Sequence, residues 1–210
     1  MGEVVHYVFV HHLRLAVHTL ILFAVGLFAA FPVIRYRLTA VEWLPLRIFA
    51  FITRLMGRTP TVLRMALVIW GFNAVAMFIY MASGFHPLLP KVFAVWTGLN
   101  IAVVAVRGRL DDDPVLSAFG RARADQWRPP VALSFVCGAL VLALELPCFW
   151  YALAMGISMG WQVQGGCAYL DALGVRALAY VSIVVPVLLV SALAESVAIR
   201  AAARPAEWDA

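Results

Sequence analysis

The sequence predicts an all-α protein built as a bundle of transmembrane helices. Of its 210 residues, 64% are hydrophobic and 13% are charged, and the mean hydropathy is +0.93. Soluble domains carry about 25% charged residues, so this chain has too few polar side chains to cover a water-facing surface. Several apolar runs also reach the roughly 20 residues that a helix needs to cross a bilayer. We therefore expect a single membrane domain over residues 1–210, with the lipid bilayer around it.

The expected spans follow from the positions of the apolar runs. Four of these runs lie at about 13–34, 62–83, 88–106 and 177–199. A fifth apolar stretch, 131–163, would be about 50 Å long as a straight helix, which is long for one crossing and short for two. Pro147 lies at its centre and cannot donate a helical hydrogen bond, so we expect this helix to be broken at Glu145-Leu146-Pro147. The prediction is five spans, or six if the broken stretch crosses twice.

The connections between these spans differ in basic residues, and this difference predicts their orientation. Residues 35–61 and 107–130 each contain several arginines, whereas 84–91 contains one lysine and 161–176 contains one arginine. Basic residues favour the cytoplasmic side of a membrane. We therefore expect 107–130 to be a cytoplasmic loop in a bacterial cytoplasmic (inner) membrane. The N-terminus is then outside and the C-terminus inside.

Residues 42–58 predict a helix that lies in the membrane surface and does not cross the bilayer. Arg47, Arg54 and Arg58 fall on one helical face, while bulky apolar residues cover much of the remainder. Such a helix directs its arginines toward lipid phosphates and its apolar side toward the acyl chains. The alternative is a short connecting helix packed on the bundle.

Composition and motifs also argue against several classes of function. The formal net charge is +5, which in a membrane chain mainly sets orientation and attracts anionic lipid head groups. The sequence contains no Walker loop, dinucleotide fingerprint or Gly-X-Ser-X-Gly motif, and its three cysteines lack metal-ligand spacing. We expect a protein that is not an enzyme, with no cofactor, no metal and no nucleic-acid partner.

Four polar side chains fall inside the expected spans: Asn73, Asn100, Glu145 and Glu195. A charge at the centre of a bilayer costs about 2.5–3.5 kcal/mol, so such residues usually face the interior of the bundle. Glu145 could accept hydrogen bonds from N–H groups freed by a break at Pro147, which is a structural role. The less favoured alternative is that it carries protons or binds cations. Glu195 could pair with Arg200 near the membrane boundary, and the asparagines could bond between helices.

Histidines near the N-terminus raise a third possibility. His11 and His18 are separated by seven positions and share a helical face with Arg14. A haem held between two spans needs a second histidine at matching depth, and the candidate elsewhere is His86, just before Pro87. A haem- or metal-binding membrane subunit is therefore the least favoured of the functions that we consider.

Five short stretches between residues 62 and 200 occur in a characteristic order. They are FNAVAMFIYMASG at 72–84, WTGLN at 96–100, LELP at 144–147, ALAMGISMG at 152–160 and VVPVLLVSALAES at 184–196. In this order the chain resembles the stage II sporulation protein M family of small polytopic membrane proteins. The matching positions are Asn73, Gly84, Gly98, Asn100, Glu145, Pro147, Pro186 and Glu195. The chain departs from the family at Leu140-Val141-Leu142, where Pro-His-Gly is usual, and at Phe72-Asn73, where adjacent asparagines are common.

This resemblance implies a scaffold, because members in spore-forming bacteria help to recruit peptidoglycan-degrading enzymes during engulfment. We therefore expect a scaffold or assembly subunit that organises other membrane or envelope proteins. The alternative is a small transporter or channel that uses Glu145 and Glu195, with Asn73 and Asn100. The small residues in 152–160 would permit close helix contact, either within the chain or in a homodimer.

Overall fold

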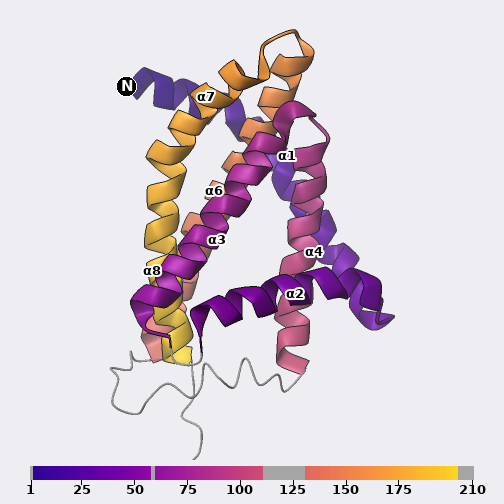
Figure 1. The fold of residues 1–210 in the computed structure, drawn as a ribbon, viewed down its shortest axis with the longest axis vertical. Helices are drawn as coiled ribbons and strands as arrows, with labels where there is room; N and C mark the ends of the chain where they lie inside the picture. Colours follow the sequence, from indigo (N-terminus) through magenta and orange to yellow (C-terminus); the bar gives the residue numbers. More distant parts are fainter. Residues whose placement is uncertain (1, 58–59, 111–130, 203–210) are drawn as a thin grey trace, which may run out of the picture.

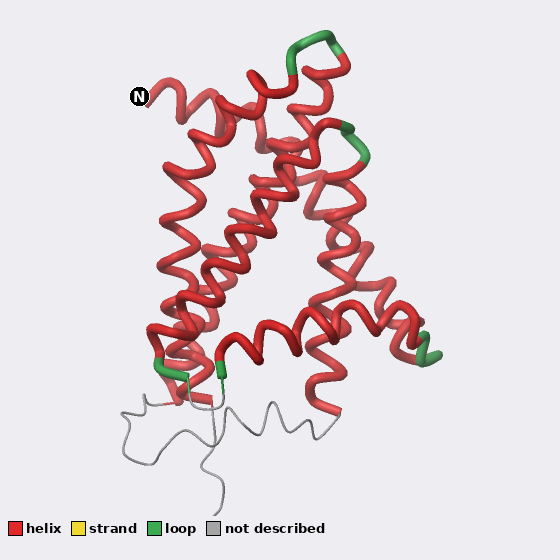
Figure 2. Tube along the Cα trace, in the orientation of Figure 1, coloured by secondary structure: helices red, strands yellow, loops and turns green. Residues whose placement is uncertain are grey.

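Helices make up nearly all of the structure, a computed structural model that describes residues 2–57, 60–110 and 131–202 (Figures 1 and 2). No strand occurs within these ranges. The helices in chain order are α1 (Gly2–Arg35), α2 (Thr39–Met56), α3 (Val62–Ala82), α4 (Leu89–Leu110), α6 (Val131–Gln164), α7 (Tyr169–Ala179) and α8 (Val185–Ala202). A short 3-10 helix, η1 (Ser83–Phe85), follows α3, and a π-helical segment, η2 (Tyr180–Val184), joins α7 to α8.

Among the residues that the structure describes, four helical runs are long and apolar enough to cross a membrane. They are Leu13–Arg35, Val62–Phe85, Val136–Gln164 and Tyr169–Arg200, and α4 adds a shorter apolar segment, Leu89–Val104. Large apolar side chains remain exposed on these helices; Phe28 on α1, for example, is 80% exposed. Soluble proteins rarely expose so much apolar surface to water, whereas membrane helices expose it to lipid. The protein is therefore an all-α membrane protein, as its composition predicts.

The predicted break at Glu145-Leu146-Pro147 is wrong. Helix α6 runs from Val131 to Gln164 as one α-helix with Pro147 inside it. A proline removes one backbone N–H donor, but the rest of the helix keeps its hydrogen bonds, and membrane helices tolerate this loss. Glu145 is therefore not needed as the cap of a half-helix, and its carboxyl bonds to a neighbouring helix.

The last helical run is longer than predicted and changes its winding halfway. It begins at Tyr169, within the region expected to be a connection, and continues through α7, η2 and α8 to Ala202. The π-helical segment ends just before Pro186, whose missing N–H leaves an upstream carbonyl without its α-helical donor. A local switch to π winding is a common response to such a disturbance.

Helix α2 lies across the other helices, toward the end of the bundle where α3 begins (Figure 1). The helix predicted for 42–58 is thus confirmed as a helix over Thr39–Met56. Arg47 and Arg54 are exposed, and the Arg47 guanidinium lies 4.6 Å from the centre of the Trp43 ring. Arg58 lies outside the described residues, as does most of the expected loop 107–130.

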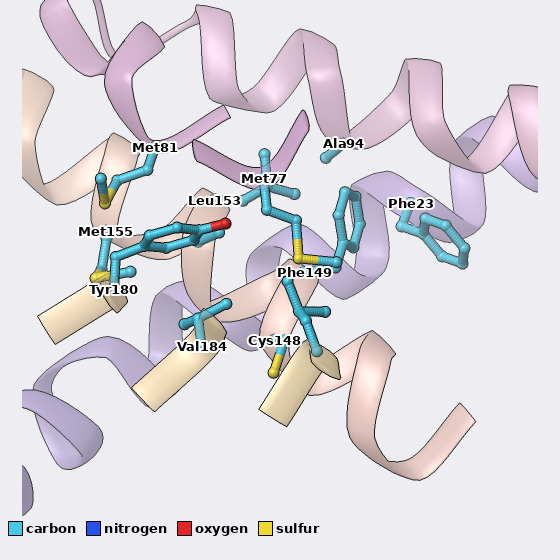
Figure 3. Close-up of a cluster of buried hydrophobic side chains, with 12 residues drawn as sticks. Phe23, Met77, Met81, Ala94, Cys148, Phe149, Leu153, Met155, Tyr180 and Val184 are labelled. Carbon is cyan, nitrogen blue, oxygen red and sulfur yellow. The ribbon is translucent and has the colours of Figure 1, made fainter. Parts of the chain in front are cut away.

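Glycines bring several helix backbones into direct contact. Gly26 on α1 and Gly98 on α4 face one another, and a Cβ at either position would overlap a carbonyl oxygen of the other helix. A Cβ at Gly84, in η1, would overlap the Gly156 carbonyl of α6. All residues from Ala152 to Gly160 are buried within the chain. Around these contacts a core gathers side chains from α1, α3, α4, α6, η2 and α8 (Figure 3).

Candidate functional site

A cavity of about 510 Å³ lies between α2, α3, α4 and α6. Helices α3 and α4 meet at the 83–88 turn and diverge toward α2, which crosses their open end (Figure 1). Helix α6 supplies the remaining wall. The lining residues are Pro45, Ile48, Phe49, Ile52, Phe72, Asn73, Ala76, Met77, Tyr80, Phe93, Trp96, Thr97, Asn100, Ile101, Val104, Glu145, Leu146 and Phe149.

Regular helical spacing explains how four different helices line one cavity. On α4 the lining positions are 93, 96, 97, 100, 101 and 104, which is one face of a 3.6-residue helix. On α2 they are 45, 48, 49 and 52, again one face. Each helix therefore presents a single stripe to the cavity. The apolar stripe of α2, rather than its arginines, was the sequence signal for this contact.

Aromatic rings fix the shape of the cavity wall. The Tyr80 ring lies 5.0 Å from Phe93 and 5.7 Å from Phe149, measured between ring centres. Phe149 in turn lies 5.6 Å from Phe23 of α1. Offset and edge-on ring pairs of this kind are favourable beyond the area that they bury. The cavity wall is therefore held in place by packing that extends into the core.

The Glu145 carboxyl is held at the cavity wall by an amide from α3. Asn73 Nδ2 donates a hydrogen bond of 2.8 Å to Glu145 Oε1. Both side chains line the cavity. Glu145 lies fourteen residues after Val131, where α6 begins, which is about 21 Å along the helix. Two residues predicted from sequence to lie in the interior thus form one contact deep in the bundle.

Asn100 reaches the same cavity from α4. Its Oδ1 atom is buried and has no hydrogen-bond partner among the described residues. One turn away, Thr97 Oγ1 donates to the Tyr80 hydroxyl over 3.1 Å. Buried acceptors are rarely left without a donor, because each such atom loses its bond to water on folding. Asn100 therefore leaves a buried acceptor beside the cavity that no described residue uses.

Glu195 lies behind Glu145 and does not line the cavity. It is on α8, close enough to Glu145 for the two carboxyl charges to interact. Ser191, one turn earlier, faces the Glu145 carboxyl, and its buried hydroxyl has no other partner among the described residues. The structure thus brings Asn73, Glu145 and Glu195 together across three helices, with Asn100 on the opposite side of the cavity.

The cavity is acidic and largely apolar. Of the described residues that line it, Glu145 is the one with an ionisable carboxyl group, and none is basic. Two neighbouring carboxyl groups in a low-dielectric interior repel each other when both are ionised. A bound proton or cation relieves that repulsion. The arrangement is therefore suited to receiving positive charge or hydrogen-bond donors, and not anions.

The remaining predicted site residues lie elsewhere. Pro147 is exposed on α6, and Arg47 and Arg54 lie on the exposed side of α2. His18 is exposed on α1, His11 has no described side chain, and His86 Nδ1 accepts a 3.3 Å hydrogen bond from the Leu88 N–H. Within the described ranges, no group of three His, Cys, Asp or Glu side chains is arranged to hold a metal ion.

Sequence reasoning missed a buried arginine far along the chain from Glu145. Arg176 on α7 donates to the Met155 carbonyl, the Ala172 carbonyl and Ser158 Oγ at 3.2, 2.9 and 2.9 Å. The bonds to Met155 and Ser158 join α7 to the small-residue part of α6, and the bond to Ala172 lies within α7. Because 161–176 was expected to be a connection, Arg176 was not expected inside the bundle. The helical run that begins at Tyr169 is what carries it inward.

Comparisons with protein-family models, curated proteins and solved structures found no match to this chain. The fold and the site therefore define the protein by its class: a helical membrane protein with an acidic cavity inside its bundle. The resemblance to the stage II sporulation protein M family stays a prediction.

Proposed function

We propose that this protein is a small transporter for cations, in which Glu145 binds the cargo inside the bundle. The observation that carries this proposal is a carboxyl group at the wall of a 510 Å³ cavity, bonded to Asn73 and without a basic neighbour along the wall described. An ionisable group within a membrane bundle is costly and is typical of ion pathways and proton relays. Glu195 supplies a second carboxyl group close to Glu145.

The scaffold expected from the family resemblance receives less support from the geometry. The small residues of 152–160 were expected to permit close helix contact, either within the chain or in a homodimer, and the structure uses them within the chain. Every residue of this segment is buried by the protein's own helices. Gly84 lies against Gly156, and Pro87 lies against Gly160. A scaffold must also present a surface to partner proteins, and no described feature distinguishes such a surface from lipid-exposed helix.

We place the protein in the bacterial cytoplasmic membrane with five crossings, counting α4 as the fifth. Its apolar segment Leu89–Val104 extends about 24 Å and the whole 22-residue helix about 33 Å, compared with a hydrocarbon core of about 30 Å. Successive runs α1, α3, α4, α6 and α7–α8 alternate in direction (Figure 1). The arginine-rich 107–130 is then cytoplasmic and the N-terminus is outside.

Cys167 offers a direct test of this orientation. It is exposed in the connection between α6 and α7, whereas Cys137 and Cys148 are buried. In a variant that keeps Cys167 as its single cysteine, a membrane-impermeant maleimide should label intact spheroplasts. Labelling that appears only after the membrane is permeabilised would reverse the proposed orientation.

The transport proposal is tested in proteoliposomes by solid-supported membrane electrometry. Pulses of protons and of ammonium should give currents that empty liposomes lack. Glu145→Gln keeps the size of the side chain and an acceptor for Asn73 but removes the charge, so the currents should fall at least tenfold. Asp171→Asn is the matched control, because Asp171 is an exposed carboxylate on α7, and it should leave the currents unchanged.

Currents no larger than those of empty liposomes would overturn the proposal, provided that the reconstituted protein is folded. The melting temperature in detergent supplies that check for wild type and for Glu145→Gln. Currents that survive in Glu145→Gln would remove this carboxyl from the pathway.

A further inference from the structure

We infer that the cargo of this cavity is an amphipathic organic cation, meaning a protonated primary or secondary amine attached to an apolar body. This inference rests on the proposed function, since it assigns a substrate class to the same cavity. It depends on three observations: the unused acceptors, the aromatic wall and the small number of oxygen ligands.

Two side chains that line the cavity, Glu145 and Asn100, carry acceptor oxygens that a ligand could use. Glu145 carries two carboxyl oxygens, and Asn73 is bonded to Oε1. Asn100 Oδ1 is buried with no partner in the described chain. A protonated primary amine has three N–H donors and a positive charge. It can therefore donate to the Glu145 carboxylate and neutralise its charge, which a neutral alcohol or an anion cannot do.

The rest of the wall selects for an apolar body. Most of the other lining residues are apolar, and five of them are aromatic: Phe49, Phe72, Phe93, Trp96 and Phe149. Aromatic faces attract an ammonium group and also bury alkyl or aryl surface. Ligand sites for small organic molecules typically enclose about 300–1,000 Å³, and this cavity lies within that range.

An inorganic metal cation fits this cavity less well than an organic one. Calcium takes six to eight oxygen ligands, and magnesium requires near-octahedral coordination, usually with retained water. The oxygen-bearing side chains along the wall are Asn73, Tyr80, Thr97, Asn100 and Glu145. Two of these, Tyr80 and Thr97, bond to each other. The remaining groups supply a single carboxylate among mainly aromatic neighbours, which suits an ammonium group better than a dehydrated metal ion.

Helix α2 gives the cavity a boundary where such molecules would collect. Pro45, Ile48, Phe49 and Ile52 face the cavity, while Arg47 and Arg54 are exposed on the same helix. An amphipathic helix of this kind lies at the level of lipid head groups. Amphipathic amines partition into this layer, with the charge near the phosphates and the apolar body in the chains. Helix α2, which forms one wall of the cavity, would thus lie in the layer that concentrates the ligand.

Binding is tested with the purified full-length protein in lipid nanodiscs, using radiolabelled 4-phenylbutylamine as the probe and empty nanodiscs as background. We expect saturable binding at one site. Unlabelled 4-phenylbutan-1-ol and 4-phenylbutanoate should compete at least tenfold less well than the amine. Glu145→Gln should weaken binding at least tenfold, and Asn100→Ala by about threefold, whereas Asp171→Asn should bind as wild type does.

The outcomes separate this inference from the transport proposal. Equal affinity of wild type and Glu145→Gln, or equal competition by the alcohol and the amine, would overturn the assignment of an amine ligand. Ion currents that depend on Glu145 without amine binding would also overturn it while leaving transport in place. Amine binding without any current would support the ligand class and overturn transport.

Discussion

The two sides of helix α4 are packed in opposite ways. One side touches α1 backbone to backbone, where Gly98 lies against the Phe23 carbonyl and Gly26 lies against the Val95 carbonyl. The other side contacts Tyr80 of α3 through Phe93 and Thr97, and the rest of it, including Trp96, faces the cavity. The first side has no room for a methyl group, whereas the second leaves about 510 Å³ unfilled.

This difference shows how a small bundle can keep a cavity open. Helices in a membrane have little hydrophobic drive to close a gap, so their positions depend on close packing and hydrogen bonds. The glycine contact fixes α4 against α1, and the contact of Gly84 with Gly156 fixes the turn between α3 and α4 against α6. With one side and one end held, α4 cannot move to fill the space beside α3.

Filling the closely packed side should have the largest effect. In Gly98→Leu the side chain would overlap the Phe23 carbonyl, and the obstacle is backbone that cannot move aside. Overpacking costs about 1–3 kcal/mol and occasionally more, and we expect this variant to exceed that range. Thermal unfolding and size-exclusion chromatography in detergent would show a large loss of folded protein.

Gly174→Leu is the matched control for that change. Gly174 is exposed on α7, and a Cβ there meets nothing within 4 Å. Its melting temperature should equal or exceed that of wild type, because leucine favours helix more than glycine does. Equal stability of the two variants would show that the α1–α4 contact is looser than described.

Filling the open side should abolish binding with little effect on folding. Ala76 on α3 lines the cavity, so Ala76→Phe would occupy part of the space reserved for the ligand. We expect amine binding in nanodiscs to weaken at least tenfold while the melting temperature changes little. Val75→Phe places the same side chain one position away, at a residue that is 61% exposed, and should bind as wild type does.

The smallest of these effects is expected at the hydrogen bond between Asn73 and Glu145. A double-mutant cycle with Asn73→Ala and Glu145→Ala would isolate its contribution to the free energy of unfolding. Hydrogen bonds between membrane helices average about 0.6 kcal/mol and reach about 1.7 kcal/mol, and we expect a coupling within this range. A coupling of zero would mean that the carboxyl is positioned by its other neighbours.

The sequence predicted the class of fold and much of the polar interior, for a common physical reason. Hydrocarbon excludes charge and free amides, so composition alone indicates helices across a membrane. The same cost predicts that Asn73 and Glu145 turn inward. The helix over 42–58 was also predicted. Its apolar stripe, formed by Pro45, Ile48, Phe49 and Ile52, is the side that lines the cavity.

The features that could not be predicted depend on how the helices are arranged. The break at Pro147 was inferred from the number of hydrogen bonds that a proline removes, but one lost bond does not outweigh the packing that surrounds α6. The cavity depends on where α3 and α4 diverge, and no single helix encodes that angle. Arg176 was predicted to lie in a connection. The helix that begins at Tyr169 has no capping side chain at its N-terminus, so the sequence did not indicate that a helix starts there.

The proline in the middle of α6 has a mechanical consequence. Pro147 has no N–H to offer the carbonyl of Ala143, so at this level the rod is missing one of the bonds that stiffen it. Bending α6 here would break no further backbone bond. The most pliable point of this 34-residue helix thus lies two residues from its acidic side chain.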